Sequence, residues 1–168
     1  RADIRTLAAR LLGRHVRDRT DRSATTQRRG AQRAAGRAEI RGDHATLVRA
    51  AQLAARSRPD LHWAIVGEGD RRGALEALIR ELALEGRVHL LGEVPDAVRL
   101  VAAADLFVMS SAMEGLGTSV LDAMALGIPV VGTAAGGIPE LLQGGAGRLV
   151  PPRDPAALAE AVRSVLEN

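Results

Sequence analysis

The sequence from residue 106 to residue 132 places a short apolar run, a glycine-containing turn, a helical segment and a second apolar run in direct succession. Leu106–Met109 is typical of a buried strand, and Thr118–Leu126 is typical of a helix that ends before Gly127. Ile128–Val131 then returns to a strand pattern. A strand, helix and strand in this order predict a parallel sheet covered by helices.

The same alternation runs from residue 42 to the end of the chain. We expect strands at 61–66, 88–91, 106–109, 128–131 and 147–150, and helices at 44–57, 71–84, 96–103, 118–126, from 136, and at 155–166. Asp43 and Asp154 stand where helix N-caps are expected. The predicted fold is therefore α/β and Rossmann-like, with helices on both faces of a mainly parallel sheet over residues 42–168.

The first 41 residues differ in charge and pattern from the rest. They hold 12 of the 23 arginines against four acids, whereas residues 42–168 are net acidic, and the chain has no lysine. We expect a helix over Ala2–Val16 and disorder over 17–41, because that stretch has too few large apolar residues to form a core. Two interpretations of this basic arm stay open, a solvated linker, which we favour, and a contact with nucleic acid or anionic lipid.

Several classes of function are disfavoured by composition. The absence of cysteine excludes disulfides and thiolate metal sites and favours a cytoplasmic location. No apolar run of about eighteen residues is present, so we expect no transmembrane segment. Trp63 and Phe107 are the only aromatic residues, which leaves no stacking platform for nucleic acid. Because residue 1 is arginine and not methionine, we expect a fragment of a longer chain.

A first candidate site is the glycine-rich turn after the strand at 61–66. Gly67, Gly69 and Gly73 precede a helix, and Glu93 follows the next strand, which is the context of a dinucleotide-binding fingerprint. The spacing is Gly-x-Gly-x-x-x-Gly, however, and the carboxylate of Glu68 would repel a pyrophosphate. We favour an ordinary strand-to-helix turn over a dinucleotide-dependent oxidoreductase.

A second candidate site surrounds the helix that starts near Gly117. The N–H groups of Gly117, Thr118 and Ser119 would face an anion at the positive end of the helix dipole. Glu114 and Asp122, on either side of this start, would accept hydrogen bonds from polyol hydroxyls. The residues fit a phosphorylated sugar, but they fit equally an arrangement in which Glu114 only complements the dipole and Asp122 is solvated.

A resemblance favours the first of these interpretations. The segments at 113–132, 136–140 and 147–152 resemble the C-terminal nucleotide-sugar-binding domain of the retaining glycosyltransferases of family 4 (GT4), which have the GT-B fold. The resemblance covers about residues 43–168 and rests on several motifs in the same order. It implies that the chain is one half of a GT-B fold.

The resemblance also implies roles for single residues. It implies that Glu114 is the catalytic-site residue that contacts the donor sugar and that Asp122 binds the ribose. It also implies that one backbone segment binds the diphosphate and sugar, and that the main chain after a strand contacts the nucleobase. The backbone segments are Gly115, Leu116, Gly117 and Thr118 for the diphosphate and sugar, and Glu93 and Val94 for the base. Such enzymes need no metal or other cofactor, and this chain has no Asp-x-Asp pair.

The sequence departs from the family pattern in three respects. Asp122 replaces a glutamate and is one methylene shorter, so a ribose contact would need a shifted ligand or a bridging water. The family's first strand, with its diphosphate-binding lysine, has no counterpart, and Arg41 is the cation that would replace that lysine. The N-terminal domain that binds the acceptor is absent.

The sequence therefore predicts the donor-binding half of a retaining glycosyltransferase, which moves a sugar from a UDP- or GDP-sugar to an unknown acceptor. This activity would require a separate N-terminal acceptor domain or subunit. The alternative is a non-catalytic nucleotide-sugar-binding or interaction module that comes from a truncated or split enzyme.

Overall fold

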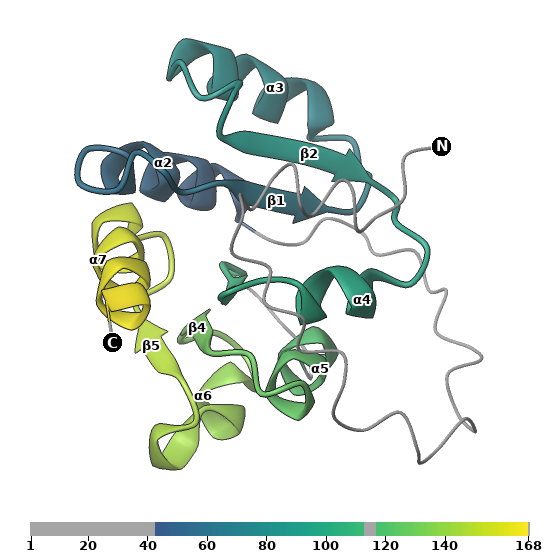
Figure 1. The fold of residues 1–168 in the computed structure, drawn as a ribbon, viewed down its shortest axis with the longest axis vertical. Coiled ribbons are helices and arrows are strands. Elements are labelled where there is room, and N and C mark those ends of the chain that lie inside the picture. Colours follow the sequence, from purple (N-terminus) through teal and green to yellow (C-terminus); the bar gives the residue numbers. More distant parts are fainter. Residues whose placement is uncertain (1–42, 113–116, 168) are drawn as a thin grey trace.

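The computed structural model describes residues 43–112 and 117–167, in which helices alternate with short strands (Figure 1). The predicted arm at residues 1–41 lies outside the described residues. The helices are α2 (His44–Ala54), α3 (Arg72–Glu81), α4 (Ala97–Ala102), α5 (Thr118–Ala125), α6 (Ile138–Leu141) and α7 (Pro155–Glu167), with a 3₁₀ turn at Gln143–Gly145. The strands are β1 (Trp63–Val66), β2 (Val88–Gly92), β3 (Phe107–Met109), β4 (Val130–Thr133) and β5 (Arg148–Val150).

The five described strands form two parallel sheets. β1 pairs with β2 so that Trp63 lies opposite Val88, and β3, β4 and β5 form a second sheet with β4 at its centre. The prediction of parallel strands flanked by helices is confirmed. A single sheet was expected, and the difference arises because a strand pattern in the sequence does not define which strands lie side by side.

The hydrophobic core has two parts, which meet at β4. Val130 faces a cluster formed with α5 and α6, and Val131 faces a cluster formed with α2, α7 and the sheet β1–β2. Both valines are almost completely buried. Since neighbouring residues of a strand point to opposite faces, β4 carries helices on both of its sides. The three-stranded sheet is thereby the middle of a three-layer arrangement.

Side-chain caps fix the starts of the two helices that pack together on one side. Asp43 Oδ1 accepts a hydrogen bond from the Thr46 N–H at 3.1 Å, and its Oδ2 accepts one from the Thr46 hydroxyl at 2.7 Å. Asp154 Oδ1 accepts hydrogen bonds from the N–H groups of Ala156 and Ala157 at 3.0 and 2.9 Å. Both predicted N-cap positions are confirmed, and each satisfies N–H groups that the helix itself leaves without acceptors.

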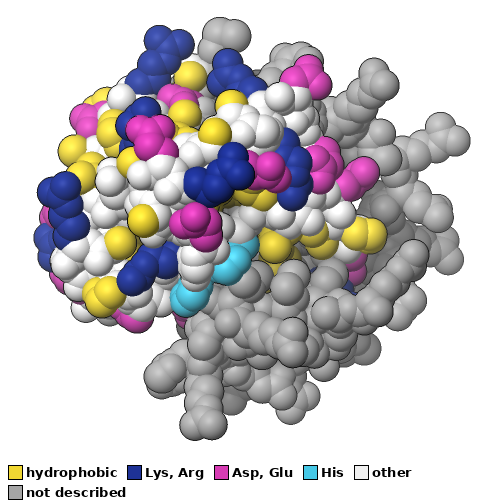
Figure 2. All heavy atoms as spheres, turned by 90° about the horizontal axis from the view of Figure 1, so that it is seen from above, with side chains coloured by type: hydrophobic (Ala, Val, Ile, Leu, Met, Phe, Trp, Pro, Cys, Tyr) yellow, Lys and Arg dark blue, Asp and Glu magenta, His cyan; other side chains and the backbone are white. Residues whose placement is uncertain are grey.

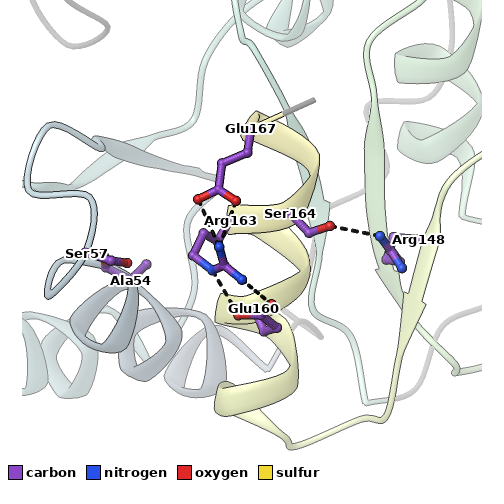
Figure 3. A network of polar contacts seen from close by, with 7 residues as sticks. All are labelled: Ala54, Ser57, Arg148, Glu160, Arg163, Ser164 and Glu167. Atoms are coloured by element: carbon purple, nitrogen blue, oxygen red, sulfur yellow. Dashed lines mark hydrogen bonds and ion pairs between the residues drawn. The ribbon is translucent and has the colours of Figure 1, made fainter.

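Polar contacts on the surface of α7 connect this helix to β5. Arg163 bridges Glu160 and Glu167 along the helix, and Arg148 of β5 donates a hydrogen bond to the Ser164 hydroxyl at 2.9 Å (Figure 3). These groups are exposed to water, so each ion pair contributes little to stability. The hydrogen bond between Arg148 and Ser164 nevertheless aligns the last helix with the edge of the three-stranded sheet.

β4 is displaced by two residues from its predicted range at both ends. The sequence pattern predicts a strand that stops at Val131, because glycine weakens a strand interior. In the structure Gly132 and Thr133 pair with Leu149 and Val150 of β5, which carries β4 on to Thr133. This extension places the Thr133 side chain at the end of β3.

Candidate functional site

The chain is held at three points where it leaves β3. The Asp43 N–H donates a hydrogen bond to the Ser110 carbonyl at 3.2 Å. Thr133 Oγ1 lies 2.5 Å from the Ser111 carbonyl oxygen and 3.3 Å from that of Met109. Ser110, Ser111 and Thr133 are all buried. The start of α2 and the end of β4 therefore both fix the position of Ser110–Ser111.

The start of α5 lies a few residues further along the chain and has N–H groups without acceptors inside the helix. Gly117 adopts a left-handed conformation, with φ 58° and ψ 44°, and provides no side-chain cap. By helical geometry the N–H groups of Thr118 and Ser119 have no acceptor within the helix, and both residues are exposed. The helix start thus presents N–H donors and the positive end of its dipole to an anion.

Gly117 is also required by close packing. A Cβ atom at this position would lie 3.3 Å from Cδ1 of Leu141 and 3.7 Å from Cγ1 of Ile138, both in α6. Its positive φ is a conformation that other L-residues adopt at a cost. Gly117 therefore lets α6 approach the start of α5 while the backbone turns into the helix.

Asp122 lies on the same face of α5 as Thr118. The two residues are four apart in the helix, so their side chains lie one turn from each other on the same face. Asp122 is exposed, and among residues that the structure describes no side-chain hydrogen bond or ion pair involves its carboxylate. The structure thus brings together Gly117, Thr118, Ser119 and Asp122, whose roles remain predictions.

Four other predicted site residues lie outside the described part of the chain. They are Arg41, Glu114, Gly115 and Leu116. In the sequence, Glu114, Gly115 and Leu116 lie between Ala112 and Gly117, and Arg41 lies two residues before Asp43. Their predicted contacts with the donor therefore remain predictions.

The predicted base-binding residues follow β2, in the other sheet. Glu93 is exposed and Val94 is half-buried, directly after Gly92. The Gly67 N–H donates a hydrogen bond to the Gly92 carbonyl at 2.8 Å, so β1 and β2 end side by side. Glu93 and Val94 therefore leave the sheet at the carboxyl ends of parallel strands, where ligands of α/β folds bind.

The turn after β1 is filled by its own side chains. Glu68 Oε1 lies 2.9 Å from Nη1 of Arg72, and Nη2 of Arg72 donates to the Leu90 carbonyl at 3.4 Å. A Cβ atom on Gly92 would lie only 2.4 Å from Glu68 Oε1, so glycine at 92 gives the carboxylate its space. A carboxylate held in the turn favours a strand-to-helix connection over a pyrophosphate site.

Sequence reasoning missed the contribution of Thr133 to the site. Its hydroxyl is fully buried and contacts carbonyls more than twenty residues earlier in the chain. The one available signal was a polar residue two positions after the apolar run 128–131, and the pattern placed that residue outside the strand. A contact between two strand ends depends on strand order, which the pattern alone does not provide.

Within residues 43–112 and 117–167, no group of three or more His, Cys, Asp or Glu side chains is arranged to hold a metal ion. In the same part of the chain, no helix is long and apolar enough to cross a membrane.

The fold and the helix start at Gly117 define an α/β domain with a candidate anion site where parallel strands end. The family model described as "Glycosyl transferases group 1" matches residues 34–168, and the chain belongs to this family. The resemblance noted from the motifs is thereby confirmed.

Known relatives agree with this assignment. The chain is 35% identical over 139 residues to the D-inositol 3-phosphate glycosyltransferase of Corynebacterium urealyticum, a match that covers 77% of this chain and 32% of the relative. The crystal structure of HepE from Anabaena in complex with UDP matches with a TM-score of 0.67 and 34% identity over 76% of this chain and 36% of that chain.

A third match concerns an isolated domain. The C-terminal domain of the group 1 glycosyl transferase LpcC from Francisella tularensis matches with a TM-score of 0.65 and 26% identity, covering 73% of this chain and 68% of that domain. By contrast, the chain spans about a third of the length of the curated relatives that it matches. The described fold is thus that of the C-terminal half of a GT-B glycosyltransferase.

Proposed function

We propose that this chain is the donor-binding half of a retaining glycosyltransferase, which transfers a sugar from a nucleoside diphosphate sugar to an acceptor. The observation that carries the proposal is the start of α5. Gly117 leaves the first N–H groups of this helix without a side-chain cap, next to the end of β3. A diphosphate bound there would accept hydrogen bonds from Thr118 and Ser119.

The predicted roles of the remaining residues are compatible with this position of the diphosphate. Glu114 would contact hydroxyls of the donor sugar, and the backbone of Gly115 and Leu116 would lie along the sugar and diphosphate. Asp122, one turn into α5, would accept hydrogen bonds from the ribose. Glu93 and Val94 would contact the base through their main chain, and Arg41 would supply a positive charge near the phosphates.

The helix start would also assist the reaction. Negative charge builds on the diphosphate as the bond to the sugar breaks, and fixed N–H donors with a helix dipole stabilise such charge without reorganisation. The proposal needs no metal ion for this task. Among nucleotides UDP is supported by the structure of HepE, which contains UDP, whereas a GDP-sugar remains the alternative donor.

Activity would require a second body that binds the acceptor. The relatives are about three times as long as the matched part, and catalysis depends on positioning the acceptor and on excluding water from the cleft. We infer that an N-terminal acceptor domain, in the same chain or as a separate subunit, completes the enzyme. We also propose a cytoplasmic location, as expected from the absence of cysteine.

The alternative function is that of a non-catalytic module. A chain that holds only the donor-binding half would bind a nucleotide sugar, or a partner protein, without transferring the sugar. This module would bind donor with the same residues, so binding measurements alone do not separate it from the enzyme. Sugar transfer after addition of an acceptor domain from a relative would distinguish the two.

The proposal is tested by a thermal-shift screen of this chain against UDP, UDP-glucose, GDP, ADP and NAD. A ligand that binds only the folded state raises Tm with its occupancy. We expect UDP or GDP and the matching sugar nucleotide to raise Tm, and NAD to have no effect. A shift with NAD alone would favour the oxidoreductase alternative, and no shift with any nucleotide would contradict donor binding.

Glu114→Ala tests the assignment of the sugar contact. If Glu114 contacts donor hydroxyls, this change should weaken binding of the sugar nucleotide much more than binding of the bare nucleoside diphosphate. Isothermal titration with both ligands measures the two losses separately. Equal losses would show that Glu114 does not act through the sugar.

A further inference from the structure

Two histidines lie against each other across the sheet β1–β2. The Nδ1 atom of His62 lies 3.3 Å from Nε2 of His89, and the two rings stack with centroids 5.5 Å apart and planes inclined by 21°. His62 is exposed and His89 is half-buried. Histidine side chains reach the surface on the face shown in Figure 2. The pair is therefore accessible to a small ion from solvent.

The register of the two strands produces this contact. Ala64 lies opposite His89 in the parallel ladder, and His62 stands two residues before Ala64, hence on the same face. Trp63 and Ile65 point to the opposite face and are buried in the core. His62 therefore lies diagonally across the strand pair from His89, within reach of its ring.

We propose that His62 and His89 form a two-histidine binding site for a divalent transition-metal ion, such as Zn²⁺ or Ni²⁺. Tetrahedral Zn²⁺ binds histidine nitrogens at about 2.0–2.1 Å, which places two such ligands about 3.3 Å apart. The observed separation of 3.3 Å between Nδ1 of His62 and Nε2 of His89 matches this value. The ion would replace the direct contact between the two nitrogens.

No acidic side chain among the described residues joins the pair. Asp60, the nearest charged neighbour before β1, is engaged by Arg58 through hydrogen bonds of 2.9 and 2.8 Å. Because no third His, Cys, Asp or Glu side chain in residues 43–112 or 117–167 joins the pair, water would complete the coordination.

A metal ion at this position would link β1 to β2. A two-stranded sheet is only marginally stable by itself, and these two strands hydrogen-bond to each other and to no other described strand. Binding to the folded state alone would therefore raise the stability of this part of the domain. The pair lies at the amino-terminal half of the strands, whereas Gly67 and Gly92 mark their carboxyl ends.

The test is isothermal titration and thermal shift of the intact chain with Zn²⁺ and with Ni²⁺, in comparison with His62→Gln, His89→Gln and the control His44→Gln. We expect each of the first two changes to weaken binding by roughly tenfold or more, since even residues that orient a metal ligand are worth about 10- to 100-fold. The control at the start of α2 should retain the affinity of the unchanged chain.

Three outcomes would overturn the proposal. They are the absence of binding by the unchanged chain, an affinity of His62→Gln or His89→Gln equal to that of the unchanged chain, and a loss in His44→Gln as large as in the other two. Circular dichroism of each variant verifies that the fold is retained, so a loss of metal binding reports on the ligands. The outcome does not depend on nucleotide binding, and it is therefore separable from the proposed transferase function.

Discussion

The hydroxyl of Thr133, the last residue of β4, lies 2.5 Å from the carbonyl oxygen of Ser111, which follows the end of β3. Thr133 is fully buried at the end of β4, and Ser111 directly precedes the segment that leads to α5. Together with the contact of the same hydroxyl with the Met109 carbonyl, this hydrogen bond helps to fix the point at which the chain enters the candidate site.

Thr133→Val should lower the free energy of unfolding by about 1–3 kcal/mol, because it keeps the shape of the side chain but leaves a buried carbonyl without its donor. Thr133→Ser retains the hydroxyl and should lose less. Urea denaturation of the three proteins measures the difference. If the valine variant were as stable as the unchanged chain, Thr133 would contribute only its packing.

Gly117→Ala should destabilise the domain and weaken nucleotide binding together. Gly127→Ala is a matched control, because Gly127 has a similar positive φ of 68° but no atom within 4 Å of its added Cβ. The left-handed conformation should cost each variant about 1–2 kcal/mol, and Gly117→Ala should lose more through the contact with Leu141. Only Gly117→Ala should reduce UDP affinity, and an equal effect of both variants would contradict a role for the α5 start.

Asp122→Glu should maintain or increase affinity for the nucleoside diphosphate, because the added methylene brings the carboxylate closer to a ribose bound at the start of α5. Asp122→Asn is the comparison, since it keeps the length and removes the charge. Titration with uridine and with free uracil separates the ribose contact from the base contact. A collapse of binding in Asp122→Glu would show that the shorter acid has another task.

Asp60 should titrate well below an ordinary aspartate. The hydrogen bonds from Arg58, helped by the charge of that guanidinium, lower the pKa of Asp60 to about 2. A lowered pKa in the folded state stabilises the fold above the unfolded value of about 3.9, and this contribution is lost as the pH falls toward 2. Because the pair is exposed, it is worth less than about 1 kcal/mol.

Arg58→Gln tests this account of Asp60. NMR titration of the carboxyl group should give a midpoint near 2 in the unchanged chain and a midpoint shifted toward about 3.9 in the variant. The difference in stability between the two proteins should vanish at the lowest pH. A midpoint that stays near 2 without Arg58 would assign the shift to the backbone.

Local patterns in the sequence predicted most of the elements. The apolar spacing of α3 and α5 and the caps at Asp43 and Asp154 depend on neighbours within one or two turns, and the structure contains them near the predicted positions. The candidate helix start at Gly117 was found in the same way. A glycine with positive φ before a helix is a local requirement, which the sequence expresses directly.

Strand order and contacts between distant segments were decided by tertiary structure. The pairing of Ala64 with His89 brings His62 to His89, and the ladder between β4 and β5 brings Thr133 to Ser111. The sequence by itself determined the helices, the strand segments and the start of α5 at Gly117, because these follow from periodicity and local backbone geometry. Only the tertiary structure decided which strand ends and side chains meet, because those contacts depend on how the whole core packs.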